Sequence, residues 1–358
     1  MPESPEHIIR EEIRALAPYR VHDASGLIKL DAMENPFELP LALREEIGYL
    51  VRDAAINRYP DSAAARLKAQ LRETMGIAAD SEILLGNGSD ELIQMLALAV
   101  AKPGAVLLGV EPSFAMFGLV AAYAGLQYRP VDLNRDFSLD VVQTLAAIDE
   151  YHPALVLIAY PNNPTGNLFD ADALAQIIRA APGLVVIDEA YHAFAESSFL
   201  PRLNEFSNLS VMRTLSKLGL AGLRLGFLVG HPGLVAQLEK LRLPYNVNVL
   251  TQIVAERVLR ETALLAEQAG AIKRERRRLF GALQSIRGVT AFPSSGNFIL
   301  FCVSHADAVF EGLKQRGLLI RNLNGVHRSL AGCLRVTVGT PQQNRAFMRA
   351  LNESLEAV

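Results

Sequence analysis

Short apolar runs alternate with longer amphipathic segments between about residues 82 and 230. Continuous runs of Val, Ile and Leu bounded by Gly, Pro, Asn or Asp are typical of strands buried on both faces of a parallel sheet. The segments between the runs have helical periodicity, with start signals at Ser89, Ser138 and Asp170. We therefore predict an α/β fold with a mainly parallel sheet of about seven strands. The predicted strands are 82–85, 105–110, 127–131, 154–159, 184–188, 210–214 and 225–229.

The pattern changes after residue 230. Residues 250–286 have the periodicity of one long helix, and short apolar runs follow it, which predicts a smaller α+β domain. The first 30 residues contain prolines and no strong element, so we expect an arm that packs on another part of the protein. The predicted late strands are 288–292, 297–303, 318–321 and 333–338. The expected units are an arm (1–30), a large domain (31–245) and a small domain (246–358).

Composition and charge exclude several classes of partner. The formal net charge is -3, so no overall basic field favours nucleic acid. No apolar run approaches the ~20 residues that span a bilayer, and the acidic N-terminal segment lacks the apolar core of a signal peptide. Only Cys302 and Cys333 occur, so at most one disulfide can form, and this low number suits a reducing compartment. We expect a cytoplasmic protein that acts on small molecules and binds neither nucleic acid nor membrane.

Several familiar catalytic motifs are missing from the sequence. There is no G-x-x-x-x-G-K-[ST] phosphate loop, no H-E-x-x-H helix and no G-x-S-x-G nucleophile elbow. The sequence therefore does not predict nucleotide hydrolysis by a phosphate loop or proteolysis by a zinc enzyme. The histidines are scattered, and two cysteines cannot form a four-cysteine zinc site, so we expect no metal.

The most informative segment surrounds Lys217. This lysine is one of only seven in the chain, and it follows a predicted strand among small and apolar residues. Desolvation there would lower its pKa and supply the neutral amine that Schiff-base chemistry needs. Ser216 and Arg224 flank it and could hold the phosphate of an aldehyde cofactor. The alternative is an ordinary surface lysine whose stem packs on the loop.

Three other segments carry polar residues where predicted strands end. Asp188 ends one strand and could keep a pyridine nitrogen protonated, although a helix cap is the alternative. Asn163 lies in the turn after the preceding strand and could donate to a phenolate oxygen, or could belong to a plain turn. Ser89 and Asp90 begin a helix, where their amides would bind an anion or form an ordinary N-terminus.

These segments, in this order, resemble fold-type I pyridoxal-phosphate aminotransferases. The spacing from Asn163 to Asp188 to Lys217 is 25 and then 29 residues, similar to that family. Further segments narrow the resemblance to the histidinol-phosphate aminotransferases. They are Leu16-Ala17-Pro18-Tyr19, Met33-Glu34-Asn35-Pro36, Asn57-Arg58-Tyr59-Pro60-Asp61 and Cys333-Leu334-Arg335-Val336-Thr337-Val338-Gly339.

The resemblance implies a role for each candidate at the pyridoxal 5'-phosphate site. Lys217 would form the Schiff base, Asp188 would pair with the pyridine nitrogen, and Asn163 and Tyr191 would hold the ring oxygen. Phe114 stands where many family members have a stacking tyrosine.

The resemblance also implies how the cofactor phosphate is held. Its ligands would be Ser89, Asp90, Ser216 and Arg224, with Tyr59 reaching it from the second subunit of a homodimer that shares its active sites. The loop from Lys217 to Arg224 is one residue shorter than the commoner form.

The resemblance also implies the substrates. Arg335, with Arg321 nearby, would take the substrate's anion, and Tyr19 and Asn35 would line the substrate side. The implied reaction converts histidinol phosphate and 2-oxoglutarate to imidazole-acetol phosphate and glutamate, a step of histidine biosynthesis. An aromatic amino acid aminotransferase and a threonine-phosphate decarboxylase-like lyase are the alternatives, because both resemble this branch.

Overall fold

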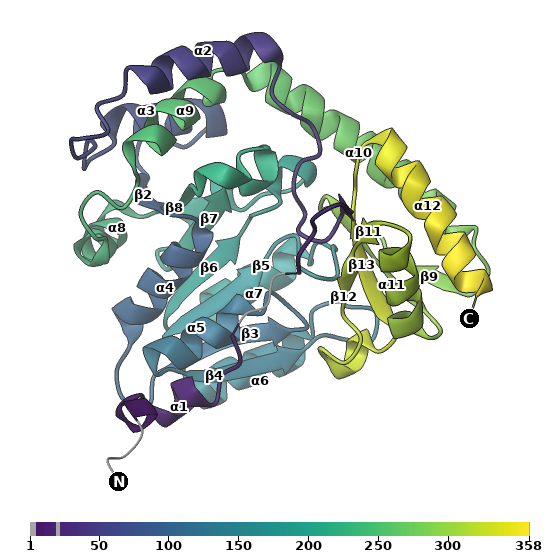
Figure 1. The fold of residues 1–358 in the computed structure, drawn as a ribbon. Helices are drawn as coiled ribbons and strands as arrows, with labels where there is room; N and C mark the ends of the chain where they lie inside the picture. Colours follow the sequence, from purple (N-terminus) through teal and green to yellow (C-terminus); the bar gives the residue numbers. More distant parts are fainter. Residues whose placement is uncertain (1–4, 19–21, 358) are drawn as a thin grey trace.

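The computed structural model describes residues 5–18 and 22–357 and confirms the α/β fold (Figure 1). A seven-stranded sheet has the order β2-β8-β7-β6-β5-β3-β4. Every predicted strand of this sheet forms within one residue of its predicted bounds. The strands are β2 (Glu82–Gly86), β3 (Val106–Glu111), β4 (Gln127–Asp132), β5 (Leu155–Ala159), β6 (Leu184–Asp188), β7 (Leu209–Thr214) and β8 (Gly226–Gly230).

The large sheet is mainly parallel, as predicted. Strands β3 to β7 pair in parallel, and β8 is antiparallel to both of its neighbours, β2 and β7. The carboxyl ends of β5, β6 and β7 therefore meet at one edge. In register, Ala159 at the end of β5 lies beside Asp188 at the end of β6. This edge is where an α/β sheet of this kind binds its ligands.

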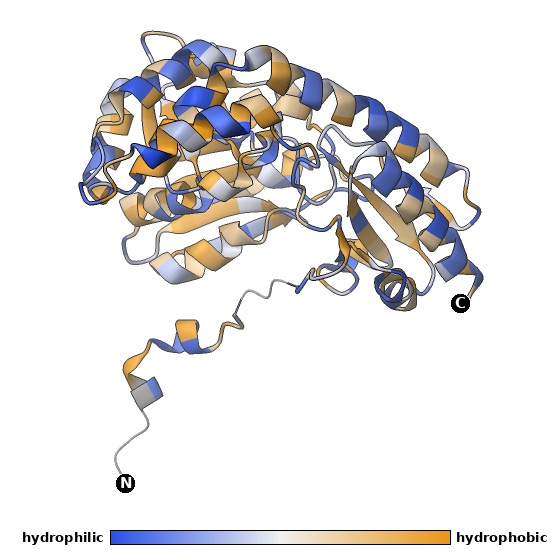
Figure 2. Ribbon diagram, turned by 45° about the horizontal axis from the view of Figure 1, so that its top comes forward, coloured by the Kyte–Doolittle hydropathy of each residue, from blue (hydrophilic) through white to orange (hydrophobic). Residues whose placement is uncertain are grey.

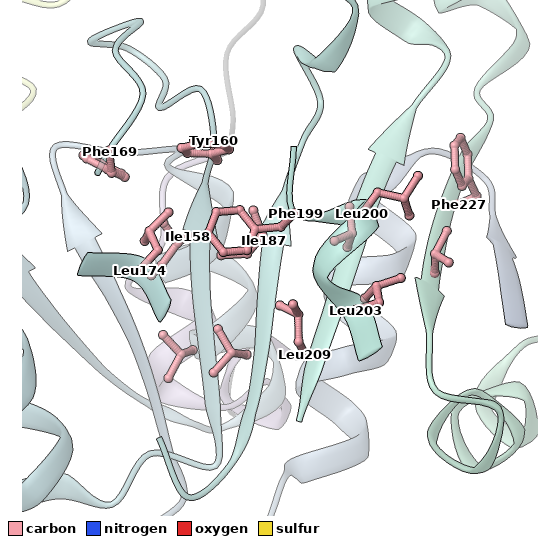
Figure 3. Close-up of a cluster of buried hydrophobic side chains, with 14 of the residues drawn as sticks. Ile158, Tyr160, Phe169, Leu174, Ile187, Phe199, Leu200, Leu203, Leu209 and Phe227 are labelled. Atoms are coloured by element: carbon pink, nitrogen blue, oxygen red, sulfur yellow. The ribbon is translucent and has the colours of Figure 1, made fainter. Parts of the chain in front are cut away.

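Both faces of the large sheet are covered. In β5, Leu155 and Leu157 pack against α4 (Ser89–Val100), α5 (Met116–Ala124) and α8 (Pro232–Leu238). Val156 and Ile158 point to the opposite core with α6 (Val141–Tyr151), α7 (Ala171–Ala180) and η3 (Leu200–Glu205). Figure 3 shows this second core, with Ile158 and Ile187 among side chains from η3. Burial on both faces explains why the strands are continuous apolar runs.

Two of the predicted helix starts are confirmed and one is wrong. Helix α4 begins at Ser89, and Asp170 caps α7 by accepting from the amide of Ala173 at 2.8 Å. Helix α6 does not begin at Ser138. It begins at Val141, because Asp140 accepts a hydrogen bond from the amide of Gln143 at 2.9 Å and so forms the cap.

A four-stranded antiparallel sheet forms the second, smaller core. Its order is β12 (Arg321–Asn322), β13 (Cys333–Thr337), β10 (Phe298–Val303) and β9 (Val289–Ala291). Its apolar side chains pack with α10 (Thr262–Gln284), α11 (Ala306–Gln315) and α12 (Pro341–Glu356). Cys302 and Cys333 lie opposite each other on β10 and β13 and form a disulfide, which ties these two strands together.

The predicted strand 318–321 is divided between two sheets. Residues of β11 (Leu318–Leu319) pair in parallel with β1 (Ile28–Lys29), whereas β12 pairs with β13. The change of partner occurs at Ile320, which separates the two short strands. An apolar run alone does not reveal a change of pairing partner, because the partner strands lie far away in the sequence.

The predicted long helix 250–286 is also wrong, because it consists of two helices. Helix α9 (Val249–Leu259) packs on α2 (Leu41–Arg52) and α3 (Ala65–Met75), and α10 packs on β9, β10 and α12. Glu261 lies between them with a non-helical ψ of 50°. Packing in two directions thus breaks a segment whose periodicity is continuous. The domain boundary at residue 245 stays a prediction.

The described part of residues 1–30 comprises η1 (Pro5–Ile8), α1 (Glu11–Arg14) and β1. Arg10 anchors it by donating from Nη2 to the carbonyl of Tyr123 in α5 at 2.6 Å. Figure 2 shows apolar strands inside the molecule and polar residues along the outer helices, with the arm at the periphery. Within residues 5–18 and 22–357, no helix combines the length and apolar character that crossing a membrane requires.

Candidate active site

A cavity of about 390 Å³ lies at the carboxyl ends of β5, β6 and β7. This volume is within the usual range for small-molecule sites. Most of the predicted cofactor residues line it, although they come from segments that are far apart in the chain. The lining includes Ser89, Asp90, Phe114, Asn163, Asp188, Tyr191, Ser216, Lys217 and Arg224.

Lys217 projects into this cavity from η4 (Ser216–Leu218), which directly follows β7. Its Nζ donates to the carbonyl oxygen of Ala32 at 3.0 Å and lies 6.0 Å from the centre of the Tyr191 ring. Burial, and then the positive charge of Arg335, lower the pKa of Lys217 to about 8. A substantial share of the amine is therefore neutral near pH 8, as a nucleophile or proton acceptor must be.

Asp188 faces the same cavity from the end of β6 and is only 4% exposed. Its Oδ1 accepts a hydrogen bond from the amide of Ala190 at 3.0 Å. Burial nevertheless raises the pKa of Asp188 to about 7, and the charges of Asp90 and Glu189 act in the same direction. A protonated ring nitrogen beside this carboxylate would relieve its desolvation.

Groups that can bind an anion gather on one side of the cavity. Helix α4 points its N-terminus, at Ser89 and Asp90, toward this side. Gly226 allows the close approach of β8, since a Cβ there would lie 2.5 Å from the amide nitrogen of Ser89. The guanidinium of Arg224 donates to Ser216 Oγ at 3.5 Å and to Asp90 Oδ2 at 3.3 Å. Amides, a hydroxyl and a guanidinium thus converge on one place despite the shortened loop before Arg224.

Asn163 lies in the turn after β5 and is 6% exposed. Its Oδ1 accepts a hydrogen bond from Nη1 of Arg335 on β13. Because the oxygen of the amide is used in this way, Nδ2 is the group that can donate to a ligand oxygen. Arg335 also donates from Nη2 to the carbonyl of Asp31 at 2.9 Å, and it is 7% exposed.

Two aromatic side chains complete the walls. The buried ring of Tyr191 packs edge-on against Phe298 at 5.0 Å. Phe114 lines the cavity and packs edge-on against Phe117 at 5.7 Å. A phenylalanine offers a flat ring a stacking surface without adding a hydroxyl.

Among the described residues, Tyr59, Asn35, Arg321 and Arg335 are predicted for the site but do not line this cavity. Tyr59 is 80% exposed and stacks on Tyr245 with the ring centres 4.4 Å apart. Asn35 donates to Gln268 Oε1 at 2.9 Å and to the carbonyl of Leu218 at 3.4 Å, so its amide supports the loop that carries Lys217. Arg321 lines the adjoining cavity, and Tyr19 lies outside the described residues.

Three of the lining residues that sequence reasoning did not assign to the site, Ala32, Glu34 and Thr214, act on Lys217 or Ser216. Ala32 accepts the hydrogen bond from Lys217. The negative charge of Glu34 acts on Lys217 and opposes the lowering of its pKa. Thr214 ends β7, and its Oγ1 donates to Ser216 Oγ at 2.9 Å. A motif could have indicated Glu34, but a main-chain contact between residues 32 and 217 has no signal in the sequence.

These groups fit a phosphorylated pyridine aldehyde. The cavity offers an amine of lowered pKa, a buried carboxylate suited to a protonated nitrogen, and an anion site at a helix N-terminus. The fold and the site thus define an enzyme that handles amino groups. The family described as "Aminotransferase class I and II" matches residues 25–351, and the chain belongs to that family.

The chain is similar to named relatives in sequence and in structure. It is 53% identical over 345 residues to histidinol-phosphate aminotransferase 2 of Nitrosococcus oceani, covering 96% of each chain. It is 50% identical over 354 residues to histidinol-phosphate aminotransferase 1 of Ralstonia nicotianae, covering 98% of this chain and 95% of that one. A crystal structure of histidinol-phosphate aminotransferase from Sinorhizobium meliloti in complex with pyridoxal-5'-phosphate has the same fold, with a TM-score of 0.87 and 24% identity over 98% of both chains.

Proposed function

We propose that this enzyme transfers the amino group of histidinol phosphate to 2-oxoglutarate with pyridoxal 5'-phosphate as its cofactor. The observation that carries the proposal is that Lys217 and Asp188 line the same cavity with opposite pKa shifts. The pKa of Lys217 is lowered to about 8, and the pKa of Asp188 is raised to about 7. Opposed pKa shifts in a shared cleft are typical of acid and base groups at an active site. The relatives named histidinol-phosphate aminotransferase support the substrate.

The cofactor would be held by groups at both ends of the cavity. The amides of Ser89 and Asp90, the hydroxyl of Ser216 and the guanidinium of Arg224 would bind its phosphate. Asp188 would keep a proton on its ring nitrogen, while Asn163 and Tyr191 would donate to its ring oxygen and Phe114 would stack on the ring. Bound in this way, pyridoxal phosphate supplies an electron sink for the electrons left when a substrate C–H bond is broken.

Lys217 would act first as the covalent anchor and then as the proton carrier. Its neutral Nζ would accept the proton from the α-carbon of the substrate, and the resulting ammonium group would then serve as the proton donor. Burial supports this role, because it lowers the pKa of the amine into the working range of a general base. The contact with the carbonyl of Ala32 would hold the detached amine near the reacting atoms.

Arg335 would bind the anion of each substrate, with Arg321 beside it. The two arginines are directly opposite each other on β12 and β13. A guanidinium fork suits both the phosphate of histidinol phosphate and a carboxylate of glutamate. Tyr19 would also line this side, and Asn35 would position the Lys217 loop rather than contact the substrate.

We further propose that the enzyme is a cytoplasmic homodimer with shared sites. Tyr59 and Tyr245 expose 80% and 41% of their surface, and the nearby Ile56 exposes 77%. Exposed apolar groups of this kind favour an interface. Such an interface would bring Tyr59 of one subunit to the cofactor phosphate of the other.

The test is a comparison of kcat/KM for histidinol phosphate, phenylalanine and tyrosine, each with 2-oxoglutarate. Preference for histidinol phosphate supports the proposal, and preference for phenylalanine or tyrosine replaces it with an aromatic aminotransferase. Carbon dioxide release from threonine phosphate in the absence of a keto acid would instead identify a lyase. Lys217→Ala is the matched inactive control, since any turnover that it retains does not come from this site.

A further inference from the structure

A second cavity, of about 530 Å³, adjoins the first. Met33, Phe114 and Asn163 line both cavities, so a substrate attached in the first can extend into the second, which Arg335 also lines. The second cavity lies between the end of β3, helix α5 and the segment of the small domain around residues 321–330. Its polar groups therefore face the part of the substrate that does not react.

The lining of this cavity carries groups of both charges. Arg321 and Arg335, which lie opposite each other on β12 and β13, are positive. Glu111, the last residue of β3, contributes a carboxylate to the lining, and its side chain is 36% exposed. A ligand that suits these groups carries an anion for the arginines and a hydrogen-bond donor for the acid.

The carboxylate of Glu111 is held in place from one side. The hydroxyl of Tyr128 donates a hydrogen bond to it. Two glycines make room for this tyrosine, because a Cβ at Gly109 would lie 3.0 Å from its hydroxyl and a Cβ at Gly118 would lie 3.2 Å from its ring. The hydrogen bond from Tyr128 and the space left by the two glycines therefore fix the position of the Glu111 carboxylate at the end of β3.

His327 lines the same cavity but is committed to another acid. Its Nδ1 accepts from the amide of Ser329 at 3.3 Å, so the neutral ring carries its hydrogen on Nε2. That nitrogen lies 3.2 Å from Asp132 Oδ1 and 3.9 Å from Glu111 Oε2. Only the first distance allows a hydrogen bond. Glu111 thus keeps acceptor capacity toward the cavity, since a carboxylate can accept up to about four hydrogen bonds.

We propose that Glu111 is a specificity-determining residue, which accepts a hydrogen bond from a ring N–H of the amino donor while Arg335 and Arg321 bind the donor's anion. This inference rests on the proposed function and names the group that selects its substrate. The imidazole ring of histidinol phosphate has such an N–H group, and the phenyl ring of phenylalanine has none.

The expected selectivity follows from the cost of an unsatisfied acid. A phenyl ring in this cavity would take water away from Glu111 without replacing its hydrogen bond, and sites of this kind reject substrates that lack the donor. Glutamate has no ring to place beside Glu111. Its half-reaction therefore depends on the arginines and not on this acid.

The experiment measures kcat/KM of the holoenzyme and of Glu111→Leu for histidinol phosphate, phenylalanine and glutamate. We expect Glu111→Leu to lower the value for histidinol phosphate by about 10- to 100-fold, the scale of a hydrogen bond to a charged group. The value for phenylalanine should change less than about threefold or rise, because no hydrogen bond is lost. Glu111→Gln keeps a carbonyl acceptor in the same place, so it should give a smaller loss.

Asp132→Asn is the matched control. Asp132 pairs with Glu111 in the register of β3 and β4, but it binds His327 and Arg328 and does not line the cavity. It should leave the preference between the two ring substrates unchanged. Calorimetric titration of histidinol phosphate into Lys217→Ala, with and without Glu111→Leu, measures the same loss as weaker binding without turnover.

Equal losses for histidinol phosphate and phenylalanine, or no loss for histidinol phosphate in both Glu111 variants, would overturn this role of Glu111. These outcomes differ from failure of the proposed function. If the wild-type protein does not transfer the amino group of glutamate, the proposed reaction is wrong, whatever the Glu111 variants do.

Discussion

Arg335 donates a hydrogen bond from Nη1 to Oδ1 of Asn163, which joins strand β13 of the small sheet to the turn after β5 of the large one. The two residues are 172 positions apart; Asn163 lines both cavities, and Arg335 lines the second. The contact fixes the orientation of the asparagine amide and the position of the guanidinium at once. The anion recognition proposed for Arg335 would thereby be coupled to the cofactor contact proposed for Asn163.

Substitution of Arg335 tests this coupling. Arg335→Ala should lower kcat/KM for both histidinol phosphate and glutamate by about 10²- to 10³-fold, because loss of a buried charged partner costs roughly 3 to 5 kcal/mol. Steady-state kinetics with each substrate provides the measurement. Arg335→Lys keeps the charge but not the fork, so it should recover only part of the loss. Near-normal kinetics for histidinol phosphate in Arg335→Ala would contradict the assignment.

Lys217 should be the residue that binds the cofactor covalently. Lys217→Ala should lower turnover by about 10³-fold or more, given the usual contribution of a general acid or base and the loss of the anchor. Borohydride reduction of the wild-type holoenzyme followed by peptide mapping should locate the label on Lys217. The exposed Lys102 supplies the control, and Lys102→Ala should behave like the wild type. A label on any other lysine would refute the site.

Asp188 should make the cofactor-free protein depend on pH. Because burial raises its pKa from 3.8 to about 7, the folded state binds more protons than the unfolded state between these values. The contribution of Asp188 to stability therefore falls as pH rises from about 4 to about 7 and stays low above that. Asp188→Asn has no such titration and should be more stable than the wild type above pH 7.

The measurement for this prediction is the melting temperature of both cofactor-free proteins from pH 4 to pH 8. One pKa unit corresponds to about 1.4 kcal/mol, so the difference should reach roughly 1 to 4 kcal/mol. Subtracting the two curves removes the titrations that the proteins share. A difference that does not change with pH would mean that the carboxyl group is not desolvated. The same variant should lose most of its aminotransferase activity, since asparagine cannot stabilise a positive ring nitrogen.

Shared active sites should be visible as complementation between two inactive variants. If Tyr59 acts across the interface, mixing Tyr59→Ala with Lys217→Ala subunits should restore activity. Half of the dimers would be mixed and one of their two sites complete, so recovery should approach about a quarter of the wild-type value. Sedimentation must first establish that mixed dimers form and that both variants fold. Mixed dimers without activity would contradict a shared site.

The strands of the large sheet could be predicted from sequence because each one is buried on both faces. Such a strand is a continuous apolar run, and its polar end residue marks the ligand edge, as at Asp188. Most of the proposed cofactor residues could be located in this way, since they follow strand ends or begin helices. Their convergence on one cavity follows from the parallel order of β5, β6 and β7.

Other features depend on contacts that local sequence does not encode. The break at Glu261 arises because α9 and α10 pack on different parts of the protein. The contact between Lys217 and Ala32 joins residues 185 positions apart through a main-chain oxygen. The position of Glu111 is fixed by Tyr128 on the next strand, and glycines on β3 and α5 create the space. None of these relationships has a periodicity or a spacing that could reveal it.

The burial of Asp188 also bears on how long a newly made chain survives. A folded chain that has yet to acquire its cofactor carries a desolvated carboxylate, and binding a protonated ring nitrogen would remove that penalty. Ligands that bind only the folded state raise its population, whereas cellular proteases remove chains from the unfolded one. Protein turnover should therefore slow as vitamin supply increases, so that the abundance of the enzyme follows the availability of the compound it needs.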